Sequence, residues 1–273
     1  MSHDIAELRS TAQHIRGKII DMSHKSGAAH LGSSLSCVDI LVALYWNALS
    51  INPDKPSAPD RDRFILSKGH AASSLYATLA FKGFFPVDVL DTFAMPGSRL
   101  EEHPGPNCIS GVEAATGSLG HGLSIGIGMA LSSRIQEQKY RVFALLSDGE
   151  CNEGSVWEAA MFAAGQYLDN VLAIIDFNKW QATGRSCEVM SLKPLKEKWE
   201  SFGWSAYEID GHNMSELVNA LNNFPDGSGR PVAIIAHTVK GKGVSFMEDD
   251  NNWHYRIPDK EEVMKAKKEL GLS

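Results

Sequence analysis

Two apolar stretches joined by a helical segment constrain the fold of this chain most. Residues 141–146, RVFALL, are rich in β-branched and aromatic side chains and predict a buried parallel strand. Residues 154–167 carry apolar residues at helical spacing, and residues 171–176 predict a second buried strand. A strand-helix-strand unit of this length makes a right-handed crossover, which brings the carboxyl ends of both strands to one edge of the sheet.

Polar residues follow both strands at that edge. Asp148 and Gly149 end the first strand, and Asn178 follows the second. The Asp148 carboxylate, the Asn178 side-chain carbonyl and the backbone carbonyl of Trp180 are oxygen ligands of the kind that Mg²⁺ takes together with phosphate oxygens. Gly149 has no Cβ, so a diphosphate can approach the main chain beside a helix N-terminus. An isolated Asp-Gly is usually a turn, but the flanking strands and the spaced Asn favour a metal and diphosphate site.

This arrangement resembles the thiamine diphosphate signature, in which an Asp-Gly is followed about thirty residues later by an Asn. Other segments narrow the resemblance to transketolase and occur in that family's order: SGAAHLGSSLS at 26–36, SKGHAA at 67–72, EHPGP at 102–106, TGSLGHGLS at 116–124, AHTVKGKG at 236–243 and WH at 253–254. The resemblance covers nearly the whole chain and stops where the family's first domain stops. It implies the amino-terminal subunit of a split transketolase, with residues 1–273 forming a single diphosphate-binding domain.

The fold implied by this resemblance is the thiamine diphosphate-binding α/β fold, an open, mostly parallel sheet with helices on both faces. The implied cofactors are thiamine diphosphate and Mg²⁺, or another divalent cation such as Ca²⁺ or Mn²⁺. The metal ligands are expected to be Asp148, Asn178 and Trp180. The residues expected to contact the cofactor are Ser33, His70, Gly117, Ser118, Leu119, Gly149, Asn178, Lys240 and His254.

Histidines form a second group of candidates. Imidazole hydrogen-bonds hydroxyls and moves protons near neutral pH, which suits chemistry on a ketose phosphate. The resemblance assigns substrate contact to His30, His103 and His254, and proton transfer to His30 and His254. The remaining histidines divide into three groups: His3, His14, His24 and His212 receive no role, His237 is expected to be packed, and the role of His121 stays open, as does that of Cys151.

The implied reaction is the transfer of a two-carbon glycolaldehyde unit from a ketose phosphate to an aldose or aldose phosphate. In the family, a carboxylate from the pyrimidine-binding domain activates the cofactor, and that domain is absent here. We therefore expect a partner chain carrying the pyrimidine-binding and C-terminal domains, activity only with that partner, and a heterotetramer with two copies of each chain. The sugars stay open, with pentose phosphate metabolism as the default pathway.

Two other functions remain as alternatives. The chain could be half of another thiamine diphosphate enzyme, such as a 2-oxoacid dehydrogenase first component or a relative of deoxyxylulose-phosphate synthase. It could also be a non-catalytic regulatory subunit. A nicotinamide dinucleotide site is disfavoured, because GHGLSIG at 120–126 fits GxGxxxG but follows no strand.

Composition limits partners and location. The net charge of −7 argues against a nucleic-acid surface, and no run approaches the ~18 apolar residues of a membrane span. The four cysteines show no paired spacing, so reduced thiols in the cytoplasm are expected. Two residues depart from the family pattern: Tyr255 stands where many transketolases have Gly, and Trp180 replaces a smaller aliphatic residue.

The remaining elements are predicted from periodicity and breakers. Helices are expected at 4–24, 36–49, 70–82, 122–138 and 213–222 and after residue 257. Strands are expected at 63–67, 204–209 and 231–236. Loops are expected at 52–62 and 94–112.

Overall fold

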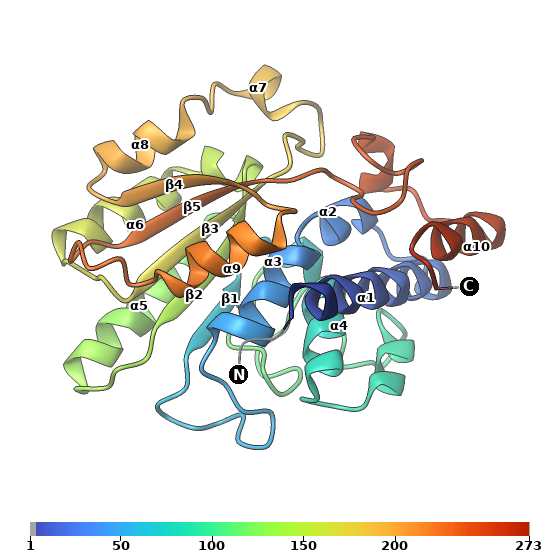
Figure 1. Ribbon diagram of the computed structural model, residues 1–273, viewed down its shortest axis with the longest axis horizontal. Coiled ribbons are helices and arrows are strands. Elements are labelled where there is room, and N and C mark those ends of the chain that lie inside the picture. Colours follow the sequence, from blue (N-terminus) through green and yellow to red (C-terminus); the bar gives the residue numbers. More distant parts are fainter. Residues whose placement is uncertain (1–3, 273) are drawn as a thin grey trace.

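A computed structural model describes residues 4–272 as an α/β fold built on a five-stranded sheet (Figure 1). All strand pairs in it are parallel, in the order β1-β2-β3-β5-β4. The strands are β1 Arg63–Leu66, β2 Val142–Ser147, β3 Val171–Phe177, β4 Ser205–Asp210 and β5 Val232–His237. The predicted fold class is confirmed, and the carboxyl ends of β2 and β3 lie at one edge, since Ser147 pairs with Asp176.

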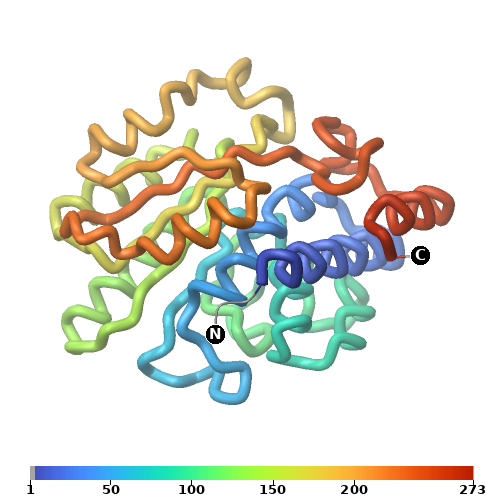
Figure 2. Tube along the Cα trace, in the orientation of Figure 1, coloured from blue at the N-terminus to red at the C-terminus, as the bar shows by residue number. Residues whose placement is uncertain are grey.

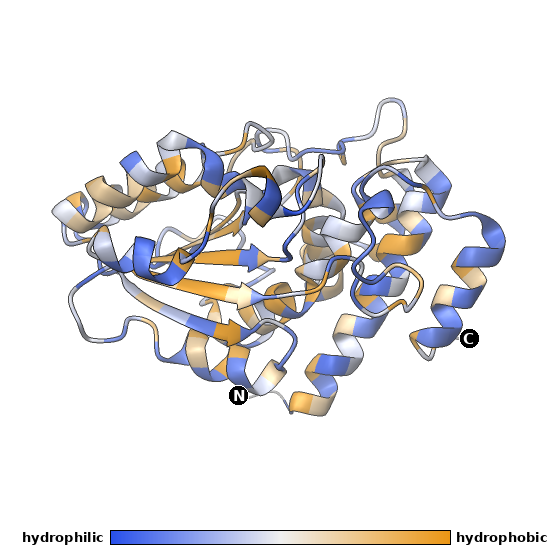
Figure 3. Ribbon diagram, turned by 90° about the horizontal axis from the view of Figure 1, so that it is seen from above, coloured by the Kyte–Doolittle hydropathy of each residue, from blue (hydrophilic) through white to orange (hydrophobic). Residues whose placement is uncertain are grey.

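Helices cover both faces of the sheet because alternate strand residues point to opposite sides. Phe143 and Leu145 belong to one apolar cluster, with residues of α1, α3, α4 and α9, whereas Ala144 and Leu146 belong to another, with residues of α5, α6 and α8. The strands are largely hydrophobic in colour in Figure 3. The helices are α1 Ile5–Ser26, α2 Leu31–Ser36, α3 Val38–Ala43, α4 Ala72–Lys82, α5 Gly122–Ile135, α6 Gly154–Gly165, α7 Ser186–Val189, α8 Leu195–Ser201, α9 Met214–Asn222 and α10 Lys260–Glu269.

Several predicted helix bounds were wrong. The predicted helix 36–49 is α3 followed by a π-helical turn at Leu44–Ala48. The predicted helices 122–138 and 154–167 end earlier, because Glu137 and Tyr167 adopt positive φ angles of 55° and 51° that terminate the helix. Helices α7 and α8 were not predicted, since runs of four and seven residues are too short to show helical periodicity.

The C-terminal segment ties the two ends of the chain together. After β5 the chain runs past α2, forms a 3₁₀ turn at Asn251–His254 and ends in α10, which packs on α1 (Figure 2). The backbone N–H of His30 donates to the carbonyl oxygen of His254 at 2.7 Å. This path places His254 beside the loop before α2, more than 200 residues away in sequence.

Across residues 4–272, we find no helix with the length and apolarity needed to cross a membrane. Cys37, Cys108, Cys151 and Cys187 are all free thiols.

Candidate functional site

A cavity of about 370 Å³ opens at the carboxyl ends of the strands, where ligands of open parallel sheets bind. Loops after β1, β2 and β3, the loop before α5, α2 and the Asn251–His254 turn all contribute to its wall. The lining residues are His30, Ser33, His70, Gly117, Leu119, Ser147, Gly149, Asn152, Glu153, Asn178, Trp180, Gln181, Ala182, Thr183 and His254. Nine of the residues predicted from sequence therefore share one cavity.

Four predicted residues do not line this cavity. Asp148 and Lys240 are fully buried behind its wall, and Ser118 is exposed. The His103 ring lies 5.7 Å from that of His30, centroid to centroid. A larger hollow of about 700 Å³ lies between β4 and α9, but none of the predicted site residues line it.

The strand tips of β2 and β3 meet at Asp148, as the crossover geometry predicts. Asp148 Oδ1 accepts from the Gly149 N–H at 3.0 Å, and Oδ2 accepts from the Lys179 N–H at 2.9 Å and from Ser186 Oγ at 2.7 Å. Oδ1 has a single partner, so it retains a lone pair for a further ligand. Burial, as the largest effect, and the charge of Asp176 raise the pKa of Asp148 to about 6.

The site fits a polar, oxygen-rich ligand and a hard cation. Asn152 Oδ1 and Gln181 Nε2 are buried without a hydrogen-bond partner, and both residues line the cavity. Because buried polar atoms normally have partners, these two indicate a polar ligand. Within the described residues, no three His, Cys, Asp or Glu side chains cluster as a metal site. The predicted set does not require such a cluster, since it combines one carboxylate with carbonyl oxygens.

Gly69 allows the loop before α5 to reach the cavity. A Cβ at Gly69 would lie 2.6 Å from the backbone nitrogen of Gly117 and 2.7 Å from the carbonyl oxygen of Thr116. Any larger residue would push this loop away from the end of β1 and remove Gly117 and Leu119 from the wall.

Four histidine rings gather at the mouth of the cavity around His30. Its ring centroid lies 5.0 Å from that of His254, 5.6 Å from that of His70 and 5.7 Å from that of His103. His30 itself has a left-handed backbone, with φ of 68°, which is uncommon for a residue other than Gly. Tyr255 borders the group, with its ring 4.7 Å from that of His254.

The histidines in this group are neutral near pH 7. Burial and the neighbouring His103 lower the pKa of His30 to about 4. Burial and Lys240 lower the pKa of His254 to about 3, and burial and Lys68 hold the pKa of His70 well below its ordinary value. Neutral imidazoles can both donate and accept hydrogen bonds, which suits recognition of sugar hydroxyls.

Lys240 sets the tautomer of His254. Lys240 Nζ lies 2.7 Å from Asn251 Oδ1 and 3.0 Å from His254 Nδ1. An ammonium group only donates, so Nδ1 of His254 accepts and its proton resides on Nε2. Burial, as the largest effect, and the charge of Lys68 lower the pKa of Lys240 to about 8.

Glu150 braces three loops of the site and was not predicted from sequence. Its carboxylate accepts from Ser67 Oγ, from the Gly120 N–H at 2.8 Å and from the Ser147 N–H at 3.3 Å. Burial raises the pKa of Glu150. No sequence signal separates this Glu from an exposed one in the first turn of a helix.

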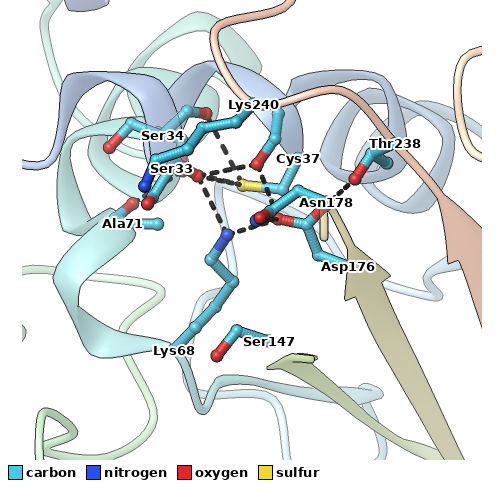
Figure 4. Close-up of polar contacts among 12 residues, drawn as sticks. Ser33, Ser34, Cys37, Lys68, Ala71, Ser147, Asp176, Asn178, Thr238 and Lys240 are labelled. Atoms are coloured by element: carbon cyan, nitrogen blue, oxygen red, sulfur yellow. Dashed lines mark hydrogen bonds and ion pairs between the residues drawn. The ribbon is translucent and has the colours of Figure 1, made fainter. Parts of the chain in front are cut away.

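A buried charge network lies directly behind the cavity (Figure 4). Lys68 forms an ion pair with Asp176, and both side chains are 0% exposed. Asp176 Oδ2 also accepts from Ser36 Oγ at 2.6 Å, and its Oδ1 accepts from Thr238 Oγ1. The sequence analysis missed this network, because the Lys of SKGHAA has no neighbouring carboxylate in sequence.

The side chain of Trp180 lies in the outer wall of the cavity. Its Nε1 donates to Asp249 Oδ1 at 2.8 Å, and the guanidinium of Arg185 lies 3.7 Å above its ring. Arg185 also donates to both Asp249 oxygens, at 2.6 and 2.7 Å. This cluster ties the segment after β3 to the segment after β5, and it leaves only the backbone of Trp180 for metal ligation.

The histidines without a predicted site role have other surroundings. His212 bridges elements, with Nδ1 2.8 Å from Asp39 Oδ2 and Nε2 2.8 Å from the Val239 N–H. His237 is partly buried, with its ring 5.2 Å from that of Phe177. His121 is exposed, and His3 lies outside the described residues.

Comparisons with known proteins assign this site to a family. The family model for the thiamine diphosphate-binding domain of transketolase matches residues 8–273. The chain therefore belongs to the transketolase family. It is 41% identical over 271 residues to an apulose-4-phosphate transketolase subunit of Phocaeicola vulgatus, covering 99% of this chain and 95% of that protein. It is 43% identical over 248 residues to a 6-deoxy-6-sulfo-D-fructose transketolase subunit of Clostridium sp., covering 91% and 90%.

Full-length transketolases match only in part. Human transketolase is 38% identical over 248 residues, which are 90% of this chain but 39% of that protein. The crystal structure of transketolase from Campylobacter jejuni superposes with a TM-score of 0.89 at 29% identity, covering 100% of this chain and 44% of that one. The chain thus spans less than half of these proteins.

These relatives confirm the prediction of a transketolase subunit that binds thiamine diphosphate, together with its class of enzyme, a transferase of aldehyde or ketone groups. Several relatives are named as one lettered subunit of a transketolase, which implies that a partner subunit completes the enzyme. The metal, the assembly and the roles of individual site residues stay predictions.

Proposed function

We propose that this chain binds thiamine diphosphate and a divalent cation and, with a second subunit, transfers a two-carbon ketol unit from a ketose phosphate to an aldose or aldose phosphate. The convergence of Asp148, Gly149 and Asn178 on a cavity ringed by neutral histidines carries this proposal. When bound, thiamine diphosphate supplies the thiazolium carbon that allows the bond next to a ketose carbonyl to break.

The strand tips hold the cation and the diphosphate. Asp148 Oδ1, Asn178 Oδ1 and the backbone oxygen of Trp180 ligate Mg²⁺, or Ca²⁺ or Mn²⁺ in its place, and the diphosphate completes the coordination. Ser33, His70 and the residues of the loop at 117–119 complete the cofactor contacts, and the point charge of Lys240 attracts the anion.

The histidines act on the sugar. His30, His103 and His254 hydrogen-bond the hydroxyls of the donor, and the low pKa values of His30 and His254 keep both able to accept a proton. His254 presents its Nε2 proton, because Lys240 occupies Nδ1. The P. vulgatus relative is named for a ketose phosphate and the Clostridium relative for a sulfonated ketose, which supports an anionic ketose as donor.

The partner is a subunit with the pyrimidine-binding domain, in a heterotetramer with two copies of each chain. Supporting this, helices α5 and α6 expose apolar side chains: Ile125, Met161 and Phe162 are 36%, 54% and 47% exposed. Residues 1–273 act as one domain in this assembly. The free thiols support a cytoplasmic location.

Reconstitution tests the proposal. The chain is co-purified with the product of a neighbouring reading frame that encodes the missing domains, and the pair is assayed with xylulose 5-phosphate and with pyruvate. We expect ketol transfer from the sugar and its loss in Asp148→Ala and His30→Ala. Turnover of pyruvate alone would indicate another class of thiamine diphosphate enzyme, and full activity of both variants would indicate a regulatory subunit.

A further inference from the structure

The Lys68–Asp176 ion pair is the most deeply buried charge pair of the site, although neither residue lines the cavity. Asp176 is the hub of the network in Figure 4, since it accepts hydrogen bonds from the residue that ends α2, from the loop after β1 and from the loop after β5. Replacing such a pair with apolar residues is often neutral for stability. Its presence beside the strand tips therefore calls for a functional reason.

Asp176 controls the orientation of the Asn178 amide. Asn178 Nδ2 lies 3.4 Å from Asp176 Oδ2. A carboxylate can only accept hydrogen bonds, so the amide nitrogen and not the amide oxygen must face it. At the other end of the amide, the Trp180 N–H donates to Asn178 Oδ1 at 3.0 Å. These two partners have opposite requirements, and together they exclude the flipped orientation.

The orientation matters because a hard cation takes the oxygen of an Asn and not its nitrogen. A flipped Asn178 would present an NH₂ group to the cation. Without Asp176, little would favour one orientation over the other before the metal arrives.

Lys68 keeps Asp176 in the form that can only accept. Burial by itself would raise the pKa of Asp176, but the ammonium of Lys68 outweighs burial and holds that pKa below its ordinary value. A protonated Asp176 could donate to Asn178 Oδ1 and so permit the flip. Lys68 Nζ also donates to the carbonyl oxygen of Ser33 at 2.9 Å, so the same ammonium fixes a predicted diphosphate contact.

We propose that Lys68 and Asp176 are positioning residues that present the Asn178 oxygen to the divalent cation. This inference rests on the proposed metal site and adds two residues that act through Asn178 without touching cofactor or substrate. Outer residues that orient metal ligands typically contribute 10- to 100-fold to metal affinity.

Two charge-free replacements test it. Lys68→Met/Asp176→Leu removes the acceptor that faces Asn178, whereas Lys68→Met/Asp176→Asn keeps the shape but offers an amide that accepts either orientation. The full chain is mixed with its partner subunit, and binding of thiamine diphosphate is followed by calorimetry while Mg²⁺ is varied. Binding of Mn²⁺, followed by electron paramagnetic resonance, reports the metal directly.

We expect the Mg²⁺ concentration for half-saturation to rise about 10-fold in the Asn variant and up to about 100-fold in the Leu variant. The Asn variant is nearly isosteric at residue 176, so it provides the test if the Leu variant does not fold. A folded variant that binds Mg²⁺ within about twofold of wild type overturns the inference.

The ion pair of Arg141 with Asp62 supplies a matched control. It lies at the opposite, amino-terminal ends of β1 and β2, and Asp62 is buried. Arg141→Met should lower the unfolding temperature yet leave the Mg²⁺ requirement within twofold of wild type. An equal rise in that requirement would assign the effect to general stability and refute the positioning role. If wild type itself takes up no thiamine diphosphate with Mg²⁺, the proposed function is wrong, and this inference falls with it.

Discussion

Removing the charge of Asp148 should stabilise the metal-free protein while abolishing its ligand binding. Burial and Asp176 raise the pKa of Asp148 from 3.8 to about 6, which corresponds to about 3 kcal/mol of unfavourable charge burial at neutral pH. In Asp148→Asn, the amide nitrogen cannot accept one set of the present hydrogen bonds, which costs about 1 kcal/mol. The expected net gain is about 2 kcal/mol.

The gain depends on pH in a defined direction. The pKa of Asp148 is higher in the folded than in the unfolded state, so ionisation destabilises the fold as pH rises. The destabilisation is absent below the unfolded pKa of about 3.8, grows up to about pH 6 and is complete above it. The difference between wild type and Asp148→Asn should therefore be full at pH 8 and nearly lost at pH 4.

Thermal unfolding in a chelator, at both pH values, measures this difference. For a domain of this size, 2 kcal/mol corresponds to roughly 4 to 8 °C. Thiamine diphosphate with Mg²⁺ at about 100 times Kd should then add about 2.7 kcal/mol to wild type and nothing to the variant, which reverses their order. A variant less stable than wild type at pH 8 without metal, or a gap independent of pH, would refute the reasoning.

Three further substitutions test other parts of the site. His212→Ala leaves the Val239 N–H and one Asp39 oxygen without a buried partner, so urea unfolding should show a loss of about 2 kcal/mol; an unchanged midpoint would contradict this. Tyr255→Gly should open the histidine cluster and raise kcat/KM for a bulky ketose phosphate about 10-fold relative to a smaller one; a constant ratio would refute the steric role. Asp249→Ala removes exposed ion pairs and should change stability by less than about 0.5 kcal/mol, yet weaken thiamine diphosphate binding several-fold by freeing the outer wall; unaltered calorimetric affinity would count against that wall.

The sequence was sufficient for the parts of the site that depend on local pattern. The apolar period of β2 and β3 and the length of their crossover bring Asp148 and the backbone of Lys179 into contact without any further information. The glycine- and proline-flanked loops were correctly expected to expose histidines, since four of those rings lie within one group.

The sequence was insufficient where burial determines chemistry. Lys68 and Glu150 are of residue types that are normally exposed, and only the packed fold shows that both are buried with specific partners. The tautomer of His254 likewise depends on Lys240, which lies fourteen residues away on a separate segment. Helices α7 and α8 were missed because they are stabilised by the neighbouring elements and not by their own periodicity.

The charges of the metal-free site are matched to ligands and not to one another. Lys68 and Asp176 compensate each other, whereas Asp148 has a raised pKa and Lys240 a lowered one, so each resists its own charge. A divalent cation favours the charged form of the first, and a diphosphate favours the charged form of the second. Binding the cation and the anion together should therefore release a proton from Asp148 near pH 6 and take one up on Lys240 near pH 8. Calorimetry in buffers of different ionisation enthalpy would show net proton release at the lower pH and net uptake at the higher. A proton balance of one sign across this range would show that the two strained charges do not serve the ligand pair.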